Sequence, residues 1–194
     1  MKKIAVFASG NGSNFQAIAD AVRQGRLKAQ ISLLVCDKPQ AYVLERALQA
    51  EIPSFVFNAK DYSSKIHYEA EVLAQLRKRG IEFIVLAGYM RLVGETLLKA
   101  YDGKIVNIHP SVLPNFPGKD AIGQALAAKA EETGVTVHFV DEGMDTGPII
   151  ASEVVEISSG ETRESLQNKL QQIEHDLYPA VLQELLAGNK EELL

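Results

Sequence analysis

Short apolar segments alternate along this chain with longer segments whose apolar residues repeat at helical spacing. Several of the apolar segments are continuous rather than alternating, which is typical of strands covered on both faces of a sheet. Strands separated by helices predict βαβ units and therefore a mostly parallel sheet. The segments that we expect to form strands are 3–8, 31–36, 54–57, 83–87, 104–108, 135–140 and 149–155.

The segments between the strands are expected to form helices. The last helix is expected to run from about Thr162 to Leu186 and to be bent or split at Pro179, because proline removes a backbone donor. A loop rich in Gly and Asp, not a helix, joins the last two expected strands, so that half of the sheet is expected to be mixed. The other helix candidates are 15–25, 41–50, 64–79, 95–101 and 121–132.

We therefore predict an α/β fold with an open, mostly parallel, twisted sheet of about seven strands, mixed at one edge, with helices on both faces. The 194 residues suit one domain, and no repeat or linker divides them, so we expect residues 1–194 to form a single domain. Ligands of open α/β sheets bind beyond the carboxyl ends of the strands. Because Gly and polar residues follow several expected strands, the candidate chemistry falls on one edge of the sheet.

Composition argues against several classes of function. The net charge is −5 without a long basic run, whereas nucleic-acid binding needs clustered Lys and Arg. The single cysteine excludes an internal disulfide and a cysteine metal cluster, and the four histidines lack the H-x-x-x-H spacing of a zinc site. No segment approaches the length of a membrane span, and the first residues do not resemble a signal peptide. We expect no metal, no nucleic-acid or membrane partner, and a cytoplasmic monomer or homodimer.

The sequence SGNGSN, residues 9–14, joins the first expected strand to the first expected helix. Gly10 and Gly12 permit a positive φ or a close approach of the backbone, and the N–H groups at the start of a helix suit a phosphate. Phe15 stands where a dinucleotide-binding motif has its third glycine, and no P-loop Gly-Lys-Ser/Thr follows. The loop therefore predicts either a phosphate monoester site or a capped tight turn without a ligand.

Asn107 and His109 stand two residues apart at the end of an expected strand. Residues two apart in a strand point to the same side, so the amide and the imidazole are expected to face one cleft. A neutral amide donor and a histidine that can carry a proton suit an oxyanion forming on a carbonyl carbon. Pro110, Pro114 and Pro117 restrict the backbone beyond them, so we expect both side chains to be held in place.

The sequence DEGMDTGP, residues 141–148, supplies the candidate acid. We choose Asp145, because Gly143 and Gly147 leave the loop free to bend around it, and a carboxylate near His109 would favour the imidazolium form. Each part also has a structural alternative, since a histidine at a strand end and an acidic turn need no ligand. No G-x-S-x-G motif supplies a covalent nucleophile. The residues alone therefore predict direct transfer of an acyl group, without identifying that group.

Four motifs together resemble one enzyme family. ASGNGSN (8–14), LAGYMR (86–91), NIHPSVLPNFPG (107–118) and GVTVHFVDEGMDTGP (134–148) match the phosphoribosylglycinamide formyltransferases of purine synthesis, in order and over essentially the whole chain. The resemblance implies a Rossmann-like formyltransferase fold. It also implies transfer of a formyl group from 10-formyltetrahydrofolate, the co-substrate, to the amine of glycinamide ribonucleotide through a tetrahedral intermediate.

The same resemblance implies roles for individual residues. Asn107, His109 and Asp145 match the catalytic residues of the family. Lys65 stands where relatives often carry Arg, at a position that contacts the folate tail, so we expect a looser contact without the planar fork of Arg. The residues that match the substrate-binding set are Gly12, Ser13, Asn14, Gln171, Gln172, Ile173 and Glu174. The residues that match the folate-binding set are Lys65, Met90, Arg91, Leu92, Val93, Asn107, Asp141, Glu142, Gly143, Met144 and Asp145.

Three other functions remain as alternatives. A methionyl-tRNA formyltransferase is expected to carry an added carboxyl-terminal domain and a basic surface, which we do not expect in a chain of net charge −5. A formyltetrahydrofolate hydrolase is expected to carry an amino-terminal regulatory domain and tends to lack proline directly after N-I-H. A non-catalytic sensor of a phosphorylated ligand would leave the Asn, His and Asp unused. His138 is expected either to sit in the core or to touch the site, with the structural role favoured, and His67 and His175 are expected to be surface or packing residues.

Overall fold

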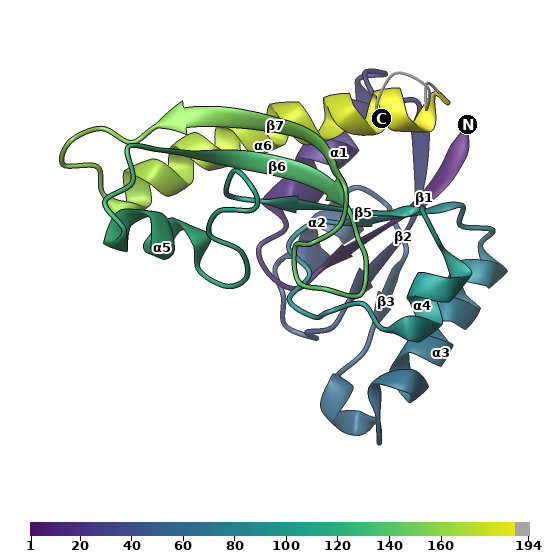
Figure 1. Cartoon of the computed structure of the whole chain (residues 1–194). Helices are drawn as coiled ribbons and strands as arrows, with labels where there is room; N and C mark the ends of the chain where they lie inside the picture. The colour runs from purple at the N-terminus through teal and green to yellow at the C-terminus, as the bar shows by residue number, and fades with distance from the viewer. Residues whose placement is uncertain (189–194) are drawn as a thin grey trace.

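A seven-stranded sheet forms the centre of the computed structural model, which describes residues 1–188 (Figure 1). The strand order is β3-β2-β1-β4-β5-β6-β7, with parallel pairing from β3 to β5. β6 pairs antiparallel with both β5 and β7, so the predicted α/β fold with a mixed edge is confirmed. The strands are β1 (Lys2–Ala8), β2 (Ala29–Cys36), β3 (Ser54–Val56), β4 (Phe83–Leu86), β5 (Ile105–His109), β6 (Glu132–Phe139) and β7 (Ile149–Glu156).

Helices cover both faces of the sheet because successive side chains of a strand point to opposite faces. Ile4 and Val6 of β1 belong to an apolar cluster with α1, α2, α5 and α6, whereas Ala5 and Phe7 belong to a cluster with α3 and α4. Figure 1 shows α1 and α6 on one side of the sheet and α3 and α4 on the other. No helix described within residues 1–188 is long and apolar enough to cross a membrane. The helices are α1 (Ser13–Arg23), α2 (Val43–Gln49), α3 (Lys65–Lys78), α4 (Glu95–Ala100), α5 (Ala121–Ala127) and α6 (Arg163–Leu186), with a 3₁₀ helix at Ala59–Asp61.

Each expected helix and strand has a counterpart, but the boundary between two of them differs. The helix expected over 121–132 ends at Ala127, and the strand expected to begin at residue 135 begins at Glu132. Glu132 pairs with Glu156 of β7, so pairing with a distant strand overrides the helical pattern of the local sequence.

The last helix, α6, has the expected extent and continues through Pro179, so of the two expected effects of the proline a split is ruled out. Tyr178, Val181 and Leu182 around the proline are buried against the sheet. Their packing stabilises a helix that the missing backbone donor of proline would weaken. That residues 1–194 form a single domain stays a prediction, since the description ends at residue 188.

Tyr178 joins α6 to the two strands that lead into the predicted ligand edge. Its side chain is fully buried, and its hydroxyl oxygen lies 2.7 Å from the carbonyl oxygen of Leu86 and 3.3 Å from that of Val106. Leu86 ends β4, and Val106 directly precedes Asn107 in β5. The hydroxyl therefore fixes both strand ends relative to the helix.

The substitution Tyr178→Phe removes this hydroxyl while keeping the ring. We expect the free energy of unfolding, measured by urea denaturation, to fall by about 1–2 kcal/mol, because a hydrogen bond is lost and a buried carbonyl loses its donor. The control Tyr42→Phe changes a ring that is more than half exposed and should shift the free energy by less than ~0.5 kcal/mol. Equal unfolding midpoints for the two variants would contradict the assigned role of the hydroxyl.

Candidate active site

A cleft of about 690 Å³ opens beyond the carboxyl ends of β1, β4 and β5. Its walls come from the glycine loop after β1, the segment 86–93, residues 107–110 and the loop between β6 and β7. α6 contributes Gln171 and Glu174. Parallel strands end at the same edge of a sheet, which is why segments far apart in the sequence meet here.

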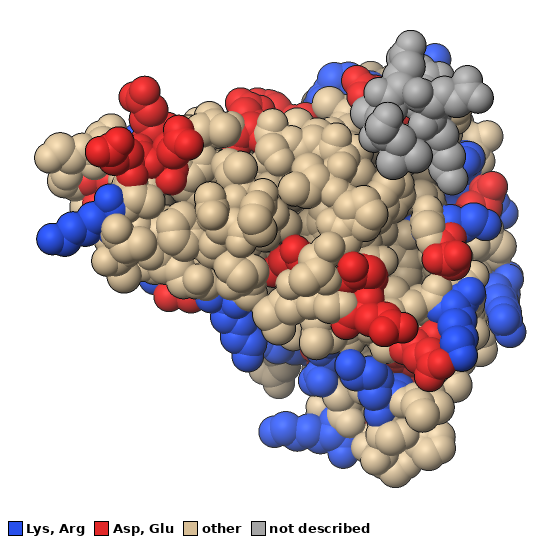
Figure 2. Space-filling model, viewed as in Figure 1, with Lys and Arg blue, Asp and Glu red and all other residues tan. Residues whose placement is uncertain are grey.

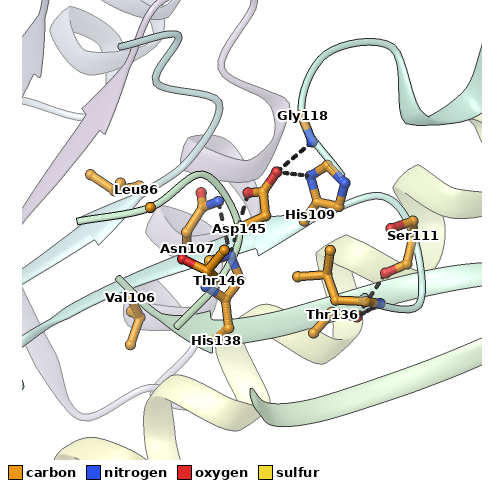
Figure 3. Close-up of polar contacts among 12 residues, drawn as sticks. Leu86, Val106, Asn107, His109, Ser111, Gly118, Thr136, His138, Asp145 and Thr146 are labelled. Carbon is orange, nitrogen blue, oxygen red and sulfur yellow. Dashed lines mark hydrogen bonds and ion pairs between the residues drawn. The ribbon is translucent and has the colours of Figure 1, made fainter. Parts of the chain in front are cut away.

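Asn107, His109 and Asp145, the three candidate catalytic residues, lie together in this cleft (Figure 3). Asn107 and His109 are on β5, and the loop between β6 and β7 brings Asp145 to them. The Oδ2 atom of Asp145 lies 3.4 Å from Nδ1 of His109 and accepts a hydrogen bond of 2.7 Å from the Gly118 N–H. The structure thus brings together the amide, the ring and the acid that the sequence predicts to converge.

His109 is buried, and each of its ring nitrogens faces an oxygen acceptor. Nε2 lies 2.8 Å from the carbonyl oxygen of Phe116, and Nδ1 faces the carboxylate of Asp145. A carbonyl oxygen cannot donate, so Nε2 carries the hydrogen in its contact. The site therefore offers acceptors for two ring hydrogens, as the imidazolium form requires.

The turn after His109 is held by Thr136, which lies opposite His109 in the pairing of β5 with β6. The Thr136 hydroxyl donates to the carbonyl of Ser111 at 2.7 Å and accepts from the Leu113 N–H at 3.1 Å (Figure 3). The position of His109 therefore depends on a cross-strand hydroxyl in addition to the prolines.

His138 lies in the cleft, although the sequence suggests a structural residue. It pairs with Asn107 across β5 and β6, and its Nε2 lies 3.3 Å from Asn107 Nδ2 and 3.6 Å from Asp145 Oδ1. Its Nδ1 lies 2.7 Å from the carbonyl oxygen of Phe139, so Nδ1 carries a hydrogen and Nε2 can accept from the amide. His138 therefore orients the Asn107 amide, and only the strand register, which joins residues 31 apart in sequence, could have revealed it.

The surroundings of Asp145 keep its carboxyl ionised at neutral pH. Burial alone would raise the pKa of this group. The hydrogen bond that the Gly118 N–H donates to the carboxylate, together with the neighbouring His109 ring, outweighs burial and lowers the pKa of Asp145 below its ordinary value. An ionised acid is therefore available beside His109.

The loop that carries Asp145 has a backbone conformation that few sequences can adopt. Asp145 has a positive φ of 57°, which is uncommon for a residue other than glycine. A Cβ at Gly147 would collide with the carbonyl oxygen of Phe139, so this position needs glycine. Strained backbone of this kind is common at functional sites.

The glycine loop is held from outside the cleft by α2. Gly12 has a φ of +80°, and a Cβ here would collide with the side chain of Val43. The Val43 N–H donates to the carbonyl of Gly10 at 3.1 Å, and the Arg46 guanidinium donates to the backbone and side-chain oxygens of Asn11, each at 2.8 Å. These contacts use oxygen atoms of the loop and leave the first N–H groups of α1 for an anion.

Glu174 of α6 faces the start of α1. Asn14 Nδ2 donates to Glu174 Oε2 at 3.1 Å, and within residues 1–188 the Asn14 Oδ1 atom has no hydrogen-bond partner. Burial raises the pKa of Glu174 to about 7, and the hydrogen bond from Asn14 offsets only part of this effect. This carboxyl therefore titrates near neutral pH.

The second half of the cleft presents apolar side chains. Met90, Leu92 and Met144 are exposed and line the cleft. Exposed apolar groups in a cleft of this size are typical of a site for an organic ligand. Lys65 and Glu142 lie outside the cleft wall, and Lys65 Nζ instead donates to the carbonyl of Leu92 at 3.0 Å.

A family model described as "Formyl transferase" matches residues 2–182. The chain belongs to the formyltransferase family. It is 55% identical over 189 residues to phosphoribosylglycinamide formyltransferase of Bacillus subtilis (strain 168), with 97% of each chain covered. The crystal structure of glycinamide ribonucleotide transformylase 1 from Geobacillus kaustophilus is 62% identical with a TM-score of 0.94, covering 96% of this chain and 99% of that one. That of phosphoribosylglycinamide formyltransferase from Bacillus halodurans is 53% identical, with a TM-score of 0.95 over 100% of both chains. The predicted membership in the phosphoribosylglycinamide formyltransferases is confirmed.

Not every predicted binding residue of this formyltransferase lines the cleft. Gln171 and Glu174 do, whereas Gln172 is exposed and Ile173 packs against the apolar core. Residues three apart share one face of a helix, and those between them point elsewhere. The binding roles of all the predicted residues, Gln172, Ile173, Lys65 and Glu142 included, stay predictions.

Other residues of the formyltransferase line the cleft without having been predicted. Arg163 and Gln167 precede Gln171 at intervals of one turn on the same face of α6, so helix phase was the available signal. Arg163 forms an ion pair with Asp120, and Lys119 lies beside it in the cleft wall. No motif points to Lys119 or Asp120, because only the fold brings the start of α5 next to the start of α6.

The surface charge of the formyltransferase is mixed. The face shown in Figure 2 carries Lys and Arg in small groups separated by Asp and Glu. Within the described range 1–188, no group of three or more His, Cys, Asp or Glu side chains is arranged to hold a metal ion. The predicted absence of a metal nevertheless stays a prediction.

Titration of Glu174 gives a prediction about stability. The ordinary pKa of this carboxyl is 4.5 but its pKa in the folded chain is about 7, so between these pH values the folded state holds more of the proton than the unfolded state does. Stability therefore falls as pH rises through this range. We expect the free energy of unfolding of Glu174→Gln to exceed that of the wild type by roughly 2–4 kcal/mol at pH 8, and by little near pH 4.5.

Urea denaturation at both pH values measures this difference. The control Glu164→Gln changes an exposed acid on the same helix and should show little dependence on pH. A Glu174→Gln difference of the same size at both pH values would contradict the raised pKa.

Proposed function

We propose that this chain transfers the formyl group of 10-formyltetrahydrofolate to the amine of glycinamide ribonucleotide in purine biosynthesis. The observation that carries the proposal is the convergence of Asn107, His109 and Asp145 between the glycine loop and segment 90–93. One half of the cleft suits a phosphate, and the other half suits an organic ring system. The names of the relatives described above support the same reaction.

The proposed reaction proceeds by direct attack. The amine nitrogen forms a bond to the formyl carbon and creates a tetrahedral oxyanion, after which the bond between that carbon and the folate nitrogen breaks. One amide hydrogen of Asn107 is directed to His138, which leaves the second for the oxyanion. The imidazolium of His109 stabilises the same negative charge.

Asp145 acts on the protons of this reaction. Its carboxylate faces Nδ1 of His109 at 3.4 Å and stabilises the positive charge of the imidazolium. Through a water molecule, it also helps to move the proton that leaves the attacking amine towards the departing folate nitrogen. Both roles need an ionised acid, and the lowered pKa of Asp145 supports them.

The two substrates are proposed to occupy opposite halves of the cleft. The phosphate of the ribonucleotide lies on Gly12, Ser13 and Asn14, and Glu174 accepts hydrogen bonds from ribose hydroxyls. The pterin of the folate lies against the backbone of segment 90–93 and the loop 141–145. A cytoplasmic location and a monomeric or homodimeric state stay predictions of the sequence.

The folate absorbance spectrum separates this proposal from its rivals. The protein is mixed with 10-formyltetrahydrofolate, with and without glycinamide ribonucleotide. We expect turnover only when the amine is present, because Asn107 and His109 stabilise charge but do not themselves attack. Turnover without the amine would indicate a hydrolase, and no turnover in either mixture would indicate a sensor.

The variant Asp145→Asn tests the role of the acid. We expect turnover to fall by about 10²–10³, as when a group that stabilises the transition state is removed. The Kd for glycinamide ribonucleotide should change little, because the phosphate site is on the glycine loop. Asp176→Asn, an exposed change on α6, serves as the control. A parallel loss of turnover and of ribonucleotide affinity would count against the assigned role.

A further inference from the structure

Asp37 is a buried carboxylate for which the proposed mechanism has no use. It directly follows β2, its side chain is 1% exposed, and it does not line the cleft. Burying a charged group is costly unless it is paired and hydrogen-bonded. The partners of Asp37 therefore indicate what the fold gains from it.

The two oxygens of Asp37 contact two different loops. Oδ1 accepts a hydrogen bond of 2.5 Å from the hydroxyl of Ser9, and Oδ2 lies 2.7 Å from Nε of Arg91. Ser9 is the first residue of the glycine loop (9–14), and Arg91 belongs to segment 90–93. A single carboxylate that lies outside the cleft thus contacts both the glycine loop and segment 90–93.

Ser9 strengthens this connection. Its N–H donates to the carbonyl of Gly88 at 3.1 Å, and its hydroxyl oxygen accepts from the Met90 N–H at 2.9 Å. The Ser9 hydroxyl therefore lies between segment 90–93 and Asp37: it accepts from the Met90 N–H and donates to the Asp37 carboxylate. Ser9 is 2% exposed, so water cannot readily replace these contacts.

Arg91 is held on a second side as well. Its guanidinium lies 5.8 Å from the centre of the Tyr68 ring, within the range of a cation–π contact. With Asp37 on Nε and Tyr68 below the guanidinium, the side chain has a defined place. The backbone of segment 90–93 is thereby tied both to β2 and to α3.

We propose that Asp37 is a positioning residue that sets the distance between the glycine loop and segment 90–93, and hence between the two substrates. The inference rests on the proposed function, which puts the ribonucleotide phosphate on one loop and the pterin on the other. Direct transfer needs reacting atoms about 3–3.5 Å apart, and a misplacement of about 1 Å costs about 10²-fold in rate.

Each loop also has contacts that do not involve Asp37. Val43 and Arg46 hold the glycine loop, and Lys65 donates to the carbonyl of Leu92 in the other segment. Loss of Asp37 therefore changes the spacing of the loops more than the structure of either one. We therefore expect the loss of Asp37 to lower kcat, while each substrate measured alone still binds.

The test compares Asp37→Ala with Asp37→Asn. Alanine removes both acceptors, and we expect kcat to fall by about 10- to 100-fold while the Kd of each substrate measured alone changes by less than about threefold. Asparagine can accept from Arg91 through its oxygen and donate to the Ser9 hydroxyl oxygen through its amide. We expect it to restore kcat to within about threefold of the wild type.

Two further variants keep the test decisive. Leu27→Ala makes a cavity at the amino end of β2, away from the cleft, and should lower thermal stability without lowering kcat per folded molecule. Ser9→Ala breaks the same connection with a smaller change in the core and should lower kcat by about tenfold even if Asp37→Ala does not fold.

The outcomes separate this inference from the proposed function. An unchanged kcat per folded molecule in Asp37→Ala or Ser9→Ala overturns the positioning role, as does a matching fall in kcat in Leu27→Ala. Affinities for both substrates that fall more than tenfold, with kcat unchanged, also overturn it, because they indicate a role in binding. Failure of the proposed function would appear in the wild type, as an absence of amine-dependent turnover.

Discussion

The site depends on the parallel pairing of β4 with both β1 and β5. Val85 of β4 lies beside Val6 on one side and Val106 on the other, so the chain leaves all three strands at one level. The glycine loop, segment 90–93 and Asn107 meet for this reason. A slip of one residue in this register would turn the Asn107 side chain to the opposite face of the sheet.

Three acids in or beside the cleft differ in the donors that surround them. Asp37 is paired with an arginine and a hydroxyl, and Asp145 accepts from the Gly118 N–H and faces histidine rings. Glu174 has a single amide donor, and burial dominates its titration. The fold therefore provides one acid that ties loops together, one that stays charged beside His109, and one that responds to neutral pH.

Much of this arrangement follows from local sequence patterns. The alternation of apolar strands and helical segments was sufficient for the seven strands and the mixed edge, because burial on one or two faces imposes its period on the sequence. The end of α5 did not follow from local patterns, because the pairing of β6 with β7 outweighs local propensity. Local patterns predicted the extent of α6, but only its packing decided that Pro179 does not split it. The sequence left the place of His138 open and did not point to Arg163, for a similar reason: their relevance depends on which distant residues lie opposite or beside them.

The sequence by itself determined the kinds of group that this formyltransferase brings to one edge of its sheet, and the motifs that relate it to its family. Two-residue spacing put Asn107 and His109 on one side of a strand, because side chains of a strand alternate. Only the tertiary structure decided the remaining distances: how close Asp145 comes to His109, which way His138 turns the amide, and how Asp37 spans two loops. Such distances depend on contacts between segments that are remote along the chain, and no local pattern encodes them.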